Sequence, residues 1–140
     1  KDGESVSHVT IDIPNIRDLE LGGGKFVVVG EGIRLGSTDG AKWQPTDLPE
    51  GQRLTWVIHT GERFLCGGGK TVYSSVDGVQ WQATELRFRG TPRWTDGKRI
   101  ISTSWPGKMY FSPDAGQTWN AAKELTANGI NRVVHGVQPK

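Results

Sequence analysis

The sequence is poor in the features that mark several classes of protein. Its 140 residues include a single cysteine, Cys66, which excludes an internal disulfide framework and a multi-cysteine zinc site. The longest apolar runs are short, as in Phe26–Val29, whereas a membrane span needs about 20 apolar residues. No stretch keeps the 3.6-residue spacing of apolar side chains that would fill an amphipathic helix. We therefore expect neither a membrane span nor a helical fold.

An excess of charge of one sign is also lacking. The 17 basic and 15 acidic side chains leave a formal net charge of +2. Mixed charges in near balance are typical of a solvated surface rather than of a surface that binds nucleic acid. Nucleic acid is therefore not expected among the partners.

What is present is a repeat. Glycine supplies 20 residues and tryptophan six, which is typical of a chain with many turns and large aromatic side chains at intervals. Three tryptophans are spaced by 38 residues, and each closes a short box that begins with serine and contains aspartate and glycine. Such a period indicates a supersecondary unit copied along the chain. The three boxes consist of Ser37, Asp39, Gly40 and Trp43; Ser75, Asp77, Gly78 and Trp81; and Ser112, Asp114, Gly116 and Trp119.

Each copy of the repeat predicts four short strands. In the second copy, turns separate four strand-like runs, and its Asp-Gly pair between the last two runs is a strong hairpin signal. Four antiparallel strands repeated every 38 residues match a β-propeller blade, for which comparable repeats have periods of about 40–45 residues. We predict an all-β chain in which residues 1–140 form one propeller segment, with blades at about 14–50, 51–88 and 89–126. The strands expected in the second blade are Leu54–His59, Arg63–Cys66, Lys70–Ser75 and Gln80–Thr84.

Two more segments predict strands of incomplete blades. Ile130–His135 echoes Leu54–His59 at twice the repeat length, and Val6–Ile13 alternates as an outer strand would. We therefore expect partial strands at about 6–13 and 130–136, on either side of three complete blades. Closed propellers have roughly 4–8 blades. The remainder of a longer propeller, or another copy of this chain, would have to complete the ring, and we favour the longer propeller.

The box residues suit a structural role at a hairpin turn. An aspartate carboxylate can accept hydrogen bonds from the backbone amides that follow it, and a serine hydroxyl can tie the same loop. Glycine supplies the positive φ of the turn. The tryptophan buries a large ring and keeps its indole N–H for a nearby carbonyl. We predict that each box fixes the outer hairpin of its blade.

The pattern Ser-x-Asp-x-Gly-x-x-Trp resembles the Asp-box, also called the bacterial neuraminidase repeat. Ser112–Trp119 matches it in full, and the first two copies are one residue shorter. The resemblance covers about residues 14–136. It implies a sialidase-like propeller whose boxes lie on the outer hairpins, away from the axis where ligands bind. Because the family includes sialidases, xyloglucan-cleaving glycosidases and sortilin-like receptors, the resemblance predicts the fold rather than the activity. It also implies a secreted, periplasmic or cell-surface location.

The sequence predicts no catalytic group. The sialidases that it resembles carry a Phe/Tyr-Arg-Ile-Pro motif, which neither Gly32–Leu35 nor Thr91–Trp94 fits. A glycosidase needs two carboxylates across the scissile bond, and the candidates have simpler interpretations, Asp18 as a solvated strand residue and Asp96 as a turn residue. His59 shares its repeat position with a leucine, which favours packing over metal binding. No catalytic residue, metal site or cofactor is therefore assigned.

The third copy departs from the repeat and holds the candidate ligand-binding residues. Arginines and aromatic residues are interleaved there, and the tryptophan of its Trp-Pro-Gly turn has no counterpart in the other copies. Arginine and aromatic side chains together can hold sugars, acidic glycans or an acidic protein surface. The simpler interpretation is that the arginines point outward and the aromatic rings pack inward. The candidates are Arg87, Arg89, Arg93, Trp94 and Trp105.

These observations predict a non-enzymatic binding or scaffold module that presents a propeller surface to a glycan or protein ligand. Two alternatives stay open. The chain could be a fragment of an Asp-box glycoside hydrolase, sialidase-like or xyloglucanase-like, whose catalytic residues lie elsewhere. It could also be a structural fragment that self-associates into a homo-oligomer.

Overall fold

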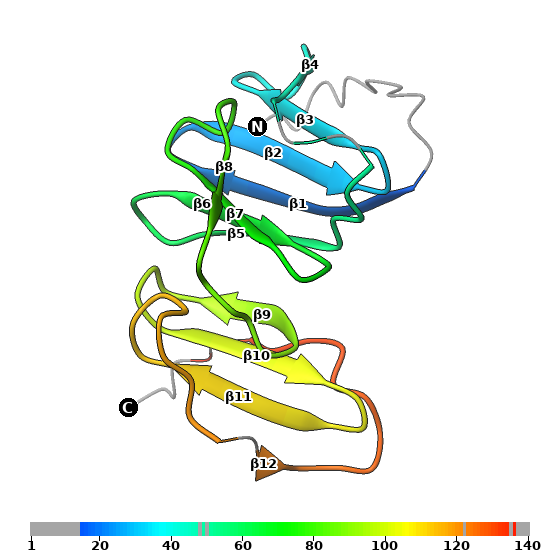
Figure 1. Ribbon diagram of the computed structural model, residues 1–140, viewed down its shortest axis with the longest axis vertical. Helices are drawn as coiled ribbons and strands as arrows, with labels where there is room; N and C mark the ends of the chain where they lie inside the picture. The colour runs from blue at the N-terminus through cyan, green and yellow to red at the C-terminus, as the bar shows by residue number, and fades with distance from the viewer. Residues whose placement is uncertain (1–14, 48, 50, 122, 135, 137–140) are drawn as a thin grey trace, which may run out of the picture.

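The computed structural model describes residues 15–47, 49, 51–121, 123–134 and 136, and the strands in this part of the chain form three four-stranded antiparallel sheets (Figure 1). Within each sheet the strands lie side by side in chain order. Sheet 1 contains β1 (Ile16–Gly22), β2 (Lys25–Gly30), β3 (Arg34–Ser37) and β4 (Gln44–Pro45). Sheet 2 contains β5 (Trp56–His59), β6 (Phe64–Gly67), β7 (Val72–Ser75) and β8 (Gln82–Thr84). Sheet 3 contains β9 (Thr91–Thr95), β10 (Ile100–Ser104), β11 (Lys108–Ser112) and β12 (Lys123–Glu124).

The prediction of an all-β chain of four-stranded units is confirmed. The strands β5 to β8 lie within two residues of the ranges expected for the second copy. Each sheet also lies within one of the three expected blade ranges. The described residues contain no helix that is long and apolar enough to cross a membrane.

The expected partial strand at about 130–136 is wrong for the residues that can be described. Residues 130–134 form no strand. A strand needs a neighbouring strand to pair its backbone groups, and here the Ile130 carbonyl instead accepts a hydrogen bond from the Thr103 hydroxyl at 3.0 Å. The other expected partial strand, at about 6–13, lies outside the described residues.

The sheets pack face to face, with β1 beside β5 and β5 beside β9. Because neighbouring strand residues point to opposite faces of a sheet, sheet 2 is apolar on both sides. On one side, Val57, Phe64 and Cys66 pack with Val27 and Val29 of sheet 1. Burying one such side chain fully contributes about 1.5–3 kcal/mol. The opposite face of sheet 2 packs toward sheet 3 in a second cluster, made of Trp56, Ile58, Leu65, Val72 and Ile100, with Leu86, Phe88 and Trp119 at its edge.

Cys66 is a packing residue of sheet 2. It is fully buried in the cluster between sheets 1 and 2. Burial raises the pKa of its thiol, so the side chain stays in the uncharged form that an apolar cluster favours.

The serine and aspartate of each box join the two ends of an outer hairpin turn. In the second box, the Ser75 hydroxyl donates to Asp77 Oδ1 at 3.0 Å and accepts the Gly78 N–H at 2.8 Å. The same Asp77 oxygen accepts the N–H groups of Val79 and Gln80, both at 2.8 Å. The first and third boxes repeat the serine–aspartate and glycine–serine bonds. Hydrogen bonds from Gln80 and Val79, in that order of effect, lower the pKa of Asp77 because they favour its charged form.

The box tryptophans differ in their hydrogen bonds. Trp43 donates its indole N–H to the Gly40 carbonyl at 3.1 Å, and Trp119 makes the corresponding bond in the third box, also at 3.1 Å. For Trp81 the expected indole bond is wrong, because its buried indole nitrogen has no partner among the described residues. The carbonyl of Gly78 lies instead against Gly36 of β3, 3.2 Å from the position that a Cβ there would occupy.

We predict that Ser75→Ala destabilises the protein by about 1–2 kcal/mol, because the buried Gly78 N–H and the Asp77 carboxylate both lose a partner. Chemical denaturation checks this. The control is Val76→Ala in the same box, since Val76 is 76% exposed and its truncation should change stability by no more than about 0.5 kcal/mol. Equal effects of the two changes would contradict the structural role of the serine.

Candidate functional site

A groove of about 420 Å³ lies beside the first strands of the three sheets. We call it the inner-strand groove. Strands β1, β5 and β9 all contribute to it, and Asn131 and Arg132 complete its lining. Residues 130–134, which form no strand, thus reach the groove that β9 also lines. The ionisable side chains that line the groove are Arg17, Asp18, Glu20, His59, Arg93 and Arg132.

Asp18 links sheet 1 to sheet 2. Its Oδ2 accepts the Val57 N–H of β5 at 2.9 Å, and its Oδ1 accepts the N–H of Leu19 at 3.0 Å. Burial raises the pKa of Asp18, although these two hydrogen bonds and the charge of Arg93 act in the opposite direction. The interpretation of Asp18 as a solvated strand residue is therefore wrong. The distance to Val57 is set by the packing of β1 on β5, which the sequence of β1 alone does not contain.

Glu20 stands two residues further along β1 and faces the same side. Burial raises the pKa of Glu20, a backbone hydrogen bond from Leu21 lowers it, and the charge of Asp18 raises it further. Among the described residues that line the groove, β5 and β9 contribute no carboxylate opposite this pair. The geometry of two carboxylates on either side of a scissile bond is therefore not found among the described residues of this groove.

The structure brings two of the five predicted ligand-binding residues together. Arg93 and Trp94 both line the inner-strand groove. The Arg93 Nε donates to the Thr103 hydroxyl at 3.2 Å, which holds the guanidinium along sheet 3. Trp94 is half-buried, with the Arg99 guanidinium carbon 5.8 Å from its ring centroid.

The other three predicted residues lie elsewhere. Arg87 and Arg89 are exposed in the segment between β8 and β9. Arg87 pairs there with Glu85 at 3.6 Å, and the Arg89 carbonyl accepts the Ser102 hydroxyl. Trp105 lies in the turn between β10 and β11 and is 76% exposed. Of the five candidate residues, only Arg93 and Trp94 therefore line the inner-strand groove.

Sequence reasoning missed Arg17, Glu20 and Arg132 as groove residues. The alternation of Asp18 and Glu20 with two leucines along β1 was a signal that could have found Glu20. Arg17 has a competing role, since it pairs with Glu31 at 3.1 Å. Arg132 had no local signal, because its segment reaches the groove without forming a strand.

His59 is held as a packed side chain at the end of β5. Its Nδ1 accepts the Gly61 N–H at 3.1 Å, and its ring packs edge-on against Phe64 with centroids 4.6 Å apart. The ring fits against Gly22 of β1, where a Cβ would lie 2.0 Å from it. Burial lowers the pKa of His59, which favours the neutral ring. No group of three potential metal-ligating side chains occurs among the described residues.

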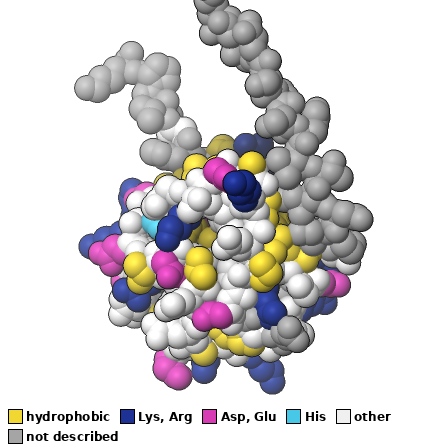
Figure 2. All heavy atoms as spheres, turned by 90° about the horizontal axis from the view of Figure 1, so that it is seen from above, with side chains coloured by type: hydrophobic (Ala, Val, Ile, Leu, Met, Phe, Trp, Pro, Cys, Tyr) yellow, Lys and Arg dark blue, Asp and Glu magenta, His cyan; other side chains and the backbone are white. Residues whose placement is uncertain are grey.

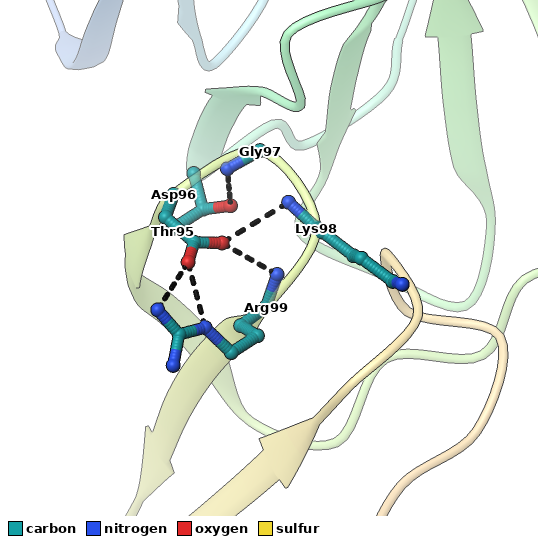
Figure 3. A network of polar contacts seen from close by, with 5 residues as sticks. All are labelled: Thr95, Asp96, Gly97, Lys98 and Arg99. Atoms are coloured by element: carbon teal, nitrogen blue, oxygen red, sulfur yellow. Dashed lines mark hydrogen bonds and ion pairs between the residues drawn. The ribbon is translucent and has the colours of Figure 1, made fainter.

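Asp96 lies in the turn between β9 and β10, as expected, and its carboxylate is occupied by that turn (Figure 3). Oδ1 accepts the N–H groups of Lys98 at 3.1 Å and Arg99 at 2.7 Å, and Oδ2 pairs with the Arg99 guanidinium at 2.6 Å. These bonds lower the pKa of Asp96 to about 2, and the backbone hydrogen bond from Arg99 has the largest effect. A group that stays ionised in this way is not suited to act as a general acid near neutral pH.

No protein-family model matches the chain, and no curated protein matches it. Among solved structures it is similar to the GH74 enzyme of Niastella koreensis, with a TM-score of 0.52 and 17% sequence identity. The similarity covers 81% of this chain and 18% of the enzyme, so the chain spans less than a fifth of that protein's length. Because GH74 enzymes are β-propeller proteins, the likeness agrees with the three sheets, and the chain has the fold of propeller blades.

The raised pKa of Glu20 gives a prediction about pH. Since the folded chain holds a proton on this carboxyl more readily than the unfolded chain does, its ionisation destabilises the folded state at neutral pH, and this effect disappears as the pH falls through the raised pKa. We expect Glu20→Gln to be more stable than the unchanged protein near pH 7, and the two to converge near pH 4.

Urea denaturation across this pH range is the measurement. The control is Glu124→Gln on β12, which is exposed and does not line the groove. A Glu20→Gln protein that is less stable than the unchanged protein near neutral pH would contradict the prediction, because it would show that the ionised carboxylate stabilises the groove.

Proposed function

We propose that the chain belongs to the Asp-box propeller family and acts as a non-enzymatic binding module outside the cytoplasm, whose inner-strand groove holds an acidic glycan or an acidic protein segment. The observation that carries this proposal is that Arg93 and Trp94 of β9 line one groove with Arg132, which comes from a later segment of the chain. Guanidinium groups pair with carboxylates in two-point geometry, and an indole ring supports the face of a sugar or a cation-bearing side chain.

The charges of the groove agree with an acidic ligand. Asp18 already accepts two backbone hydrogen bonds, from Val57 and Leu19. These N–H dipoles offset part of its negative charge, so Asp18 opposes an anionic ligand less than a carboxylate without such partners would. The boxes in the three sheets share their serine–aspartate and serine–glycine bonds, which supports the resemblance to the Asp-box family. That resemblance in turn supports an extracellular or periplasmic location.

A fragment of an Asp-box glycoside hydrolase is the second candidate function. The similarity to the Niastella koreensis GH74 enzyme favours it, as does the presence of two carboxylates of raised pKa beside each other on β1. In that case β1 would supply one wall of an active site, and a carboxylate outside this chain would face it. Hydrolysis by the complete protein that is lost in Glu20→Gln would favour this candidate over the binding module.

Self-association is the third candidate. Ile16, Leu19 and Leu21 of β1 are 46%, 50% and 53% exposed. Leu19 pairs across the sheet with Val28, whereas Val27 and Val29 point to the opposite face and pack on sheet 2. Figure 2 looks down on sheet 1 and shows hydrophobic side chains between charged ones. A homo-oligomer that buries this face would be seen as concentration-dependent light scattering.

We predict that Arg93→Gln weakens binding of the acidic ligand at least about tenfold, because a charge-assisted hydrogen bond of the groove is lost. A glycan array and a pull-down with the complete protein identify the ligand, and titration calorimetry measures the loss. Arg87→Gln is the matched control, since Arg87 is an exposed arginine outside the groove. Equal loss in both variants, or no ligand in either screen, would contradict the proposal.

A further inference from the structure

A second cavity, of about 740 Å³, lies between sheets 2 and 3 and shares no lining residue with the inner-strand groove. We call it the inter-sheet cavity. The turn between β5 and β6, the turn between β9 and β10, and the third box all contribute to its walls. Figure 3 shows Lys98, one of the lining residues, with its side chain extending from the turn away from the Asp96 carboxylate.

The repeat explains the size of the opening, because the matching place between sheets 1 and 2 holds a smaller cavity, of about 220 Å³, with Gly36 and Gly78 in its lining. There the turn of the second box packs directly on β3, with the Gly78 carbonyl 3.2 Å from the position of a Cβ on Gly36. The residue one repeat after Gly36 is Ser74. Ser74 therefore carries a side chain at the place where the first interface has bare backbone. Gly116 of the third box, which follows Gly78 by one repeat, packs on the Phe88 ring instead.

The linker before each sheet shows a second difference. Asp47 ties the second box to the chain that leaves sheet 1, since its N–H donates to the Val79 carbonyl at 3.1 Å and its Oδ1 accepts the Trp81 N–H at 2.6 Å. One repeat later the residue is Glu85. Its side chain is fully exposed and pairs with Arg87 at 3.6 Å. Among the described residues, Glu85 therefore does not make the link to the third box that Asp47 makes to the second.

The lining of the cavity contains an unused hydrogen-bonding group. Ser74 is only 4% exposed and lines the cavity, and its hydroxyl makes no hydrogen bond with another described residue. A hydroxyl that lines a cavity in this way can pair there with water or with a ligand. Leu65 and Leu86 provide apolar surface beside it, and Thr60, Thr84 and Gln117 provide further polar groups.

We propose that the inter-sheet cavity binds a neutral saccharide of one or two rings. Its volume lies in the range of about 300–1,000 Å³ that is usual for small-molecule sites. A sugar ring offers C–H groups to the leucines and hydroxyls to Ser74 and Gln117. Charged residues of both signs stand around the lining, Arg63 and Lys98 against Glu62, Asp96 and Asp114, so that a ligand with net charge gains little. This site is separate from the groove, and its occupancy does not require the acidic ligand proposed there.

The test uses the full chain, labelled with ¹⁵N and titrated separately with cellobiose, maltose and sodium glucuronate. At least one of the two neutral disaccharides is expected to shift the amide resonances of Gly61, Gly97 and Gln117, and to leave those of Val57 and Thr95 in place. Glucuronate is expected to leave all five in place. Absence of shifts with both disaccharides, shifts confined to the groove amides, or equal binding of glucuronate at the cavity would overturn the proposal.

Two variants and a matched control link the shifts to the cavity. Gln117→Trp covers the opening with a large ring and is expected to lower the affinity for the saccharide at least about tenfold. Ser74→Ala is expected to lower that affinity several-fold. Val79→Trp places the same ring one repeat earlier, outside the cavity, and is expected to bind as the unchanged protein does. Unchanged affinity in Gln117→Trp, or equal loss in Val79→Trp, would overturn the assignment. Arg93→Gln should keep this binding, which separates the cavity from the groove.

Discussion

Face-to-face packing of one β-sheet on the next is the constraint on which the rest of this structure depends. Sheet 2 can serve both neighbours because its strands are apolar on both faces, with Val57 and Cys66 toward sheet 1 and Ile58 and Leu65 toward sheet 3. This packing brings β1, β5 and β9 side by side. The inner-strand groove exists because these strands meet, and the hydrogen bond from Val57 to Asp18 is possible only at that separation.

The hairpin box fixes its own turn, but it does not determine how one sheet packs on the next. Its serine, aspartate and glycine make the same bonds in all three sheets, since those bonds involve only residues of one turn. Contacts of the box with a neighbouring sheet vary. The second box packs on Gly36 and leaves the Trp81 indole nitrogen without a partner among the described residues, whereas the third packs on Phe88. Identical turns therefore leave a small cavity of about 220 Å³ between sheets 1 and 2 and a larger one of about 740 Å³ between sheets 2 and 3.

The sequence was sufficient for what is local and repeated. The 38-residue spacing predicted the strands of sheet 2 within two residues, and the Asp96 turn was expected from its Asp-Gly pair. The sequence did not predict the interactions that a side chain makes with a neighbouring sheet. The role of Asp18 depends on where Val57 lies, and the partial strand expected at Ile130 depended on a pairing that the described residues do not make. The five candidate ligand residues were close in sequence, but antiparallel strands and turns send close neighbours to opposite ends of a sheet.

The most direct test of this packing is the pattern of nuclear Overhauser effects between sheets in solution. Face-to-face packing predicts contacts from the Val27 methyl groups to the Phe64 ring and to Gly78, and from the Phe88 ring to both Trp56 and Trp119. Strand contacts within each sheet without these contacts between sheets would show three independent hairpin units. In that case neither the groove nor the cavity would exist in the form described.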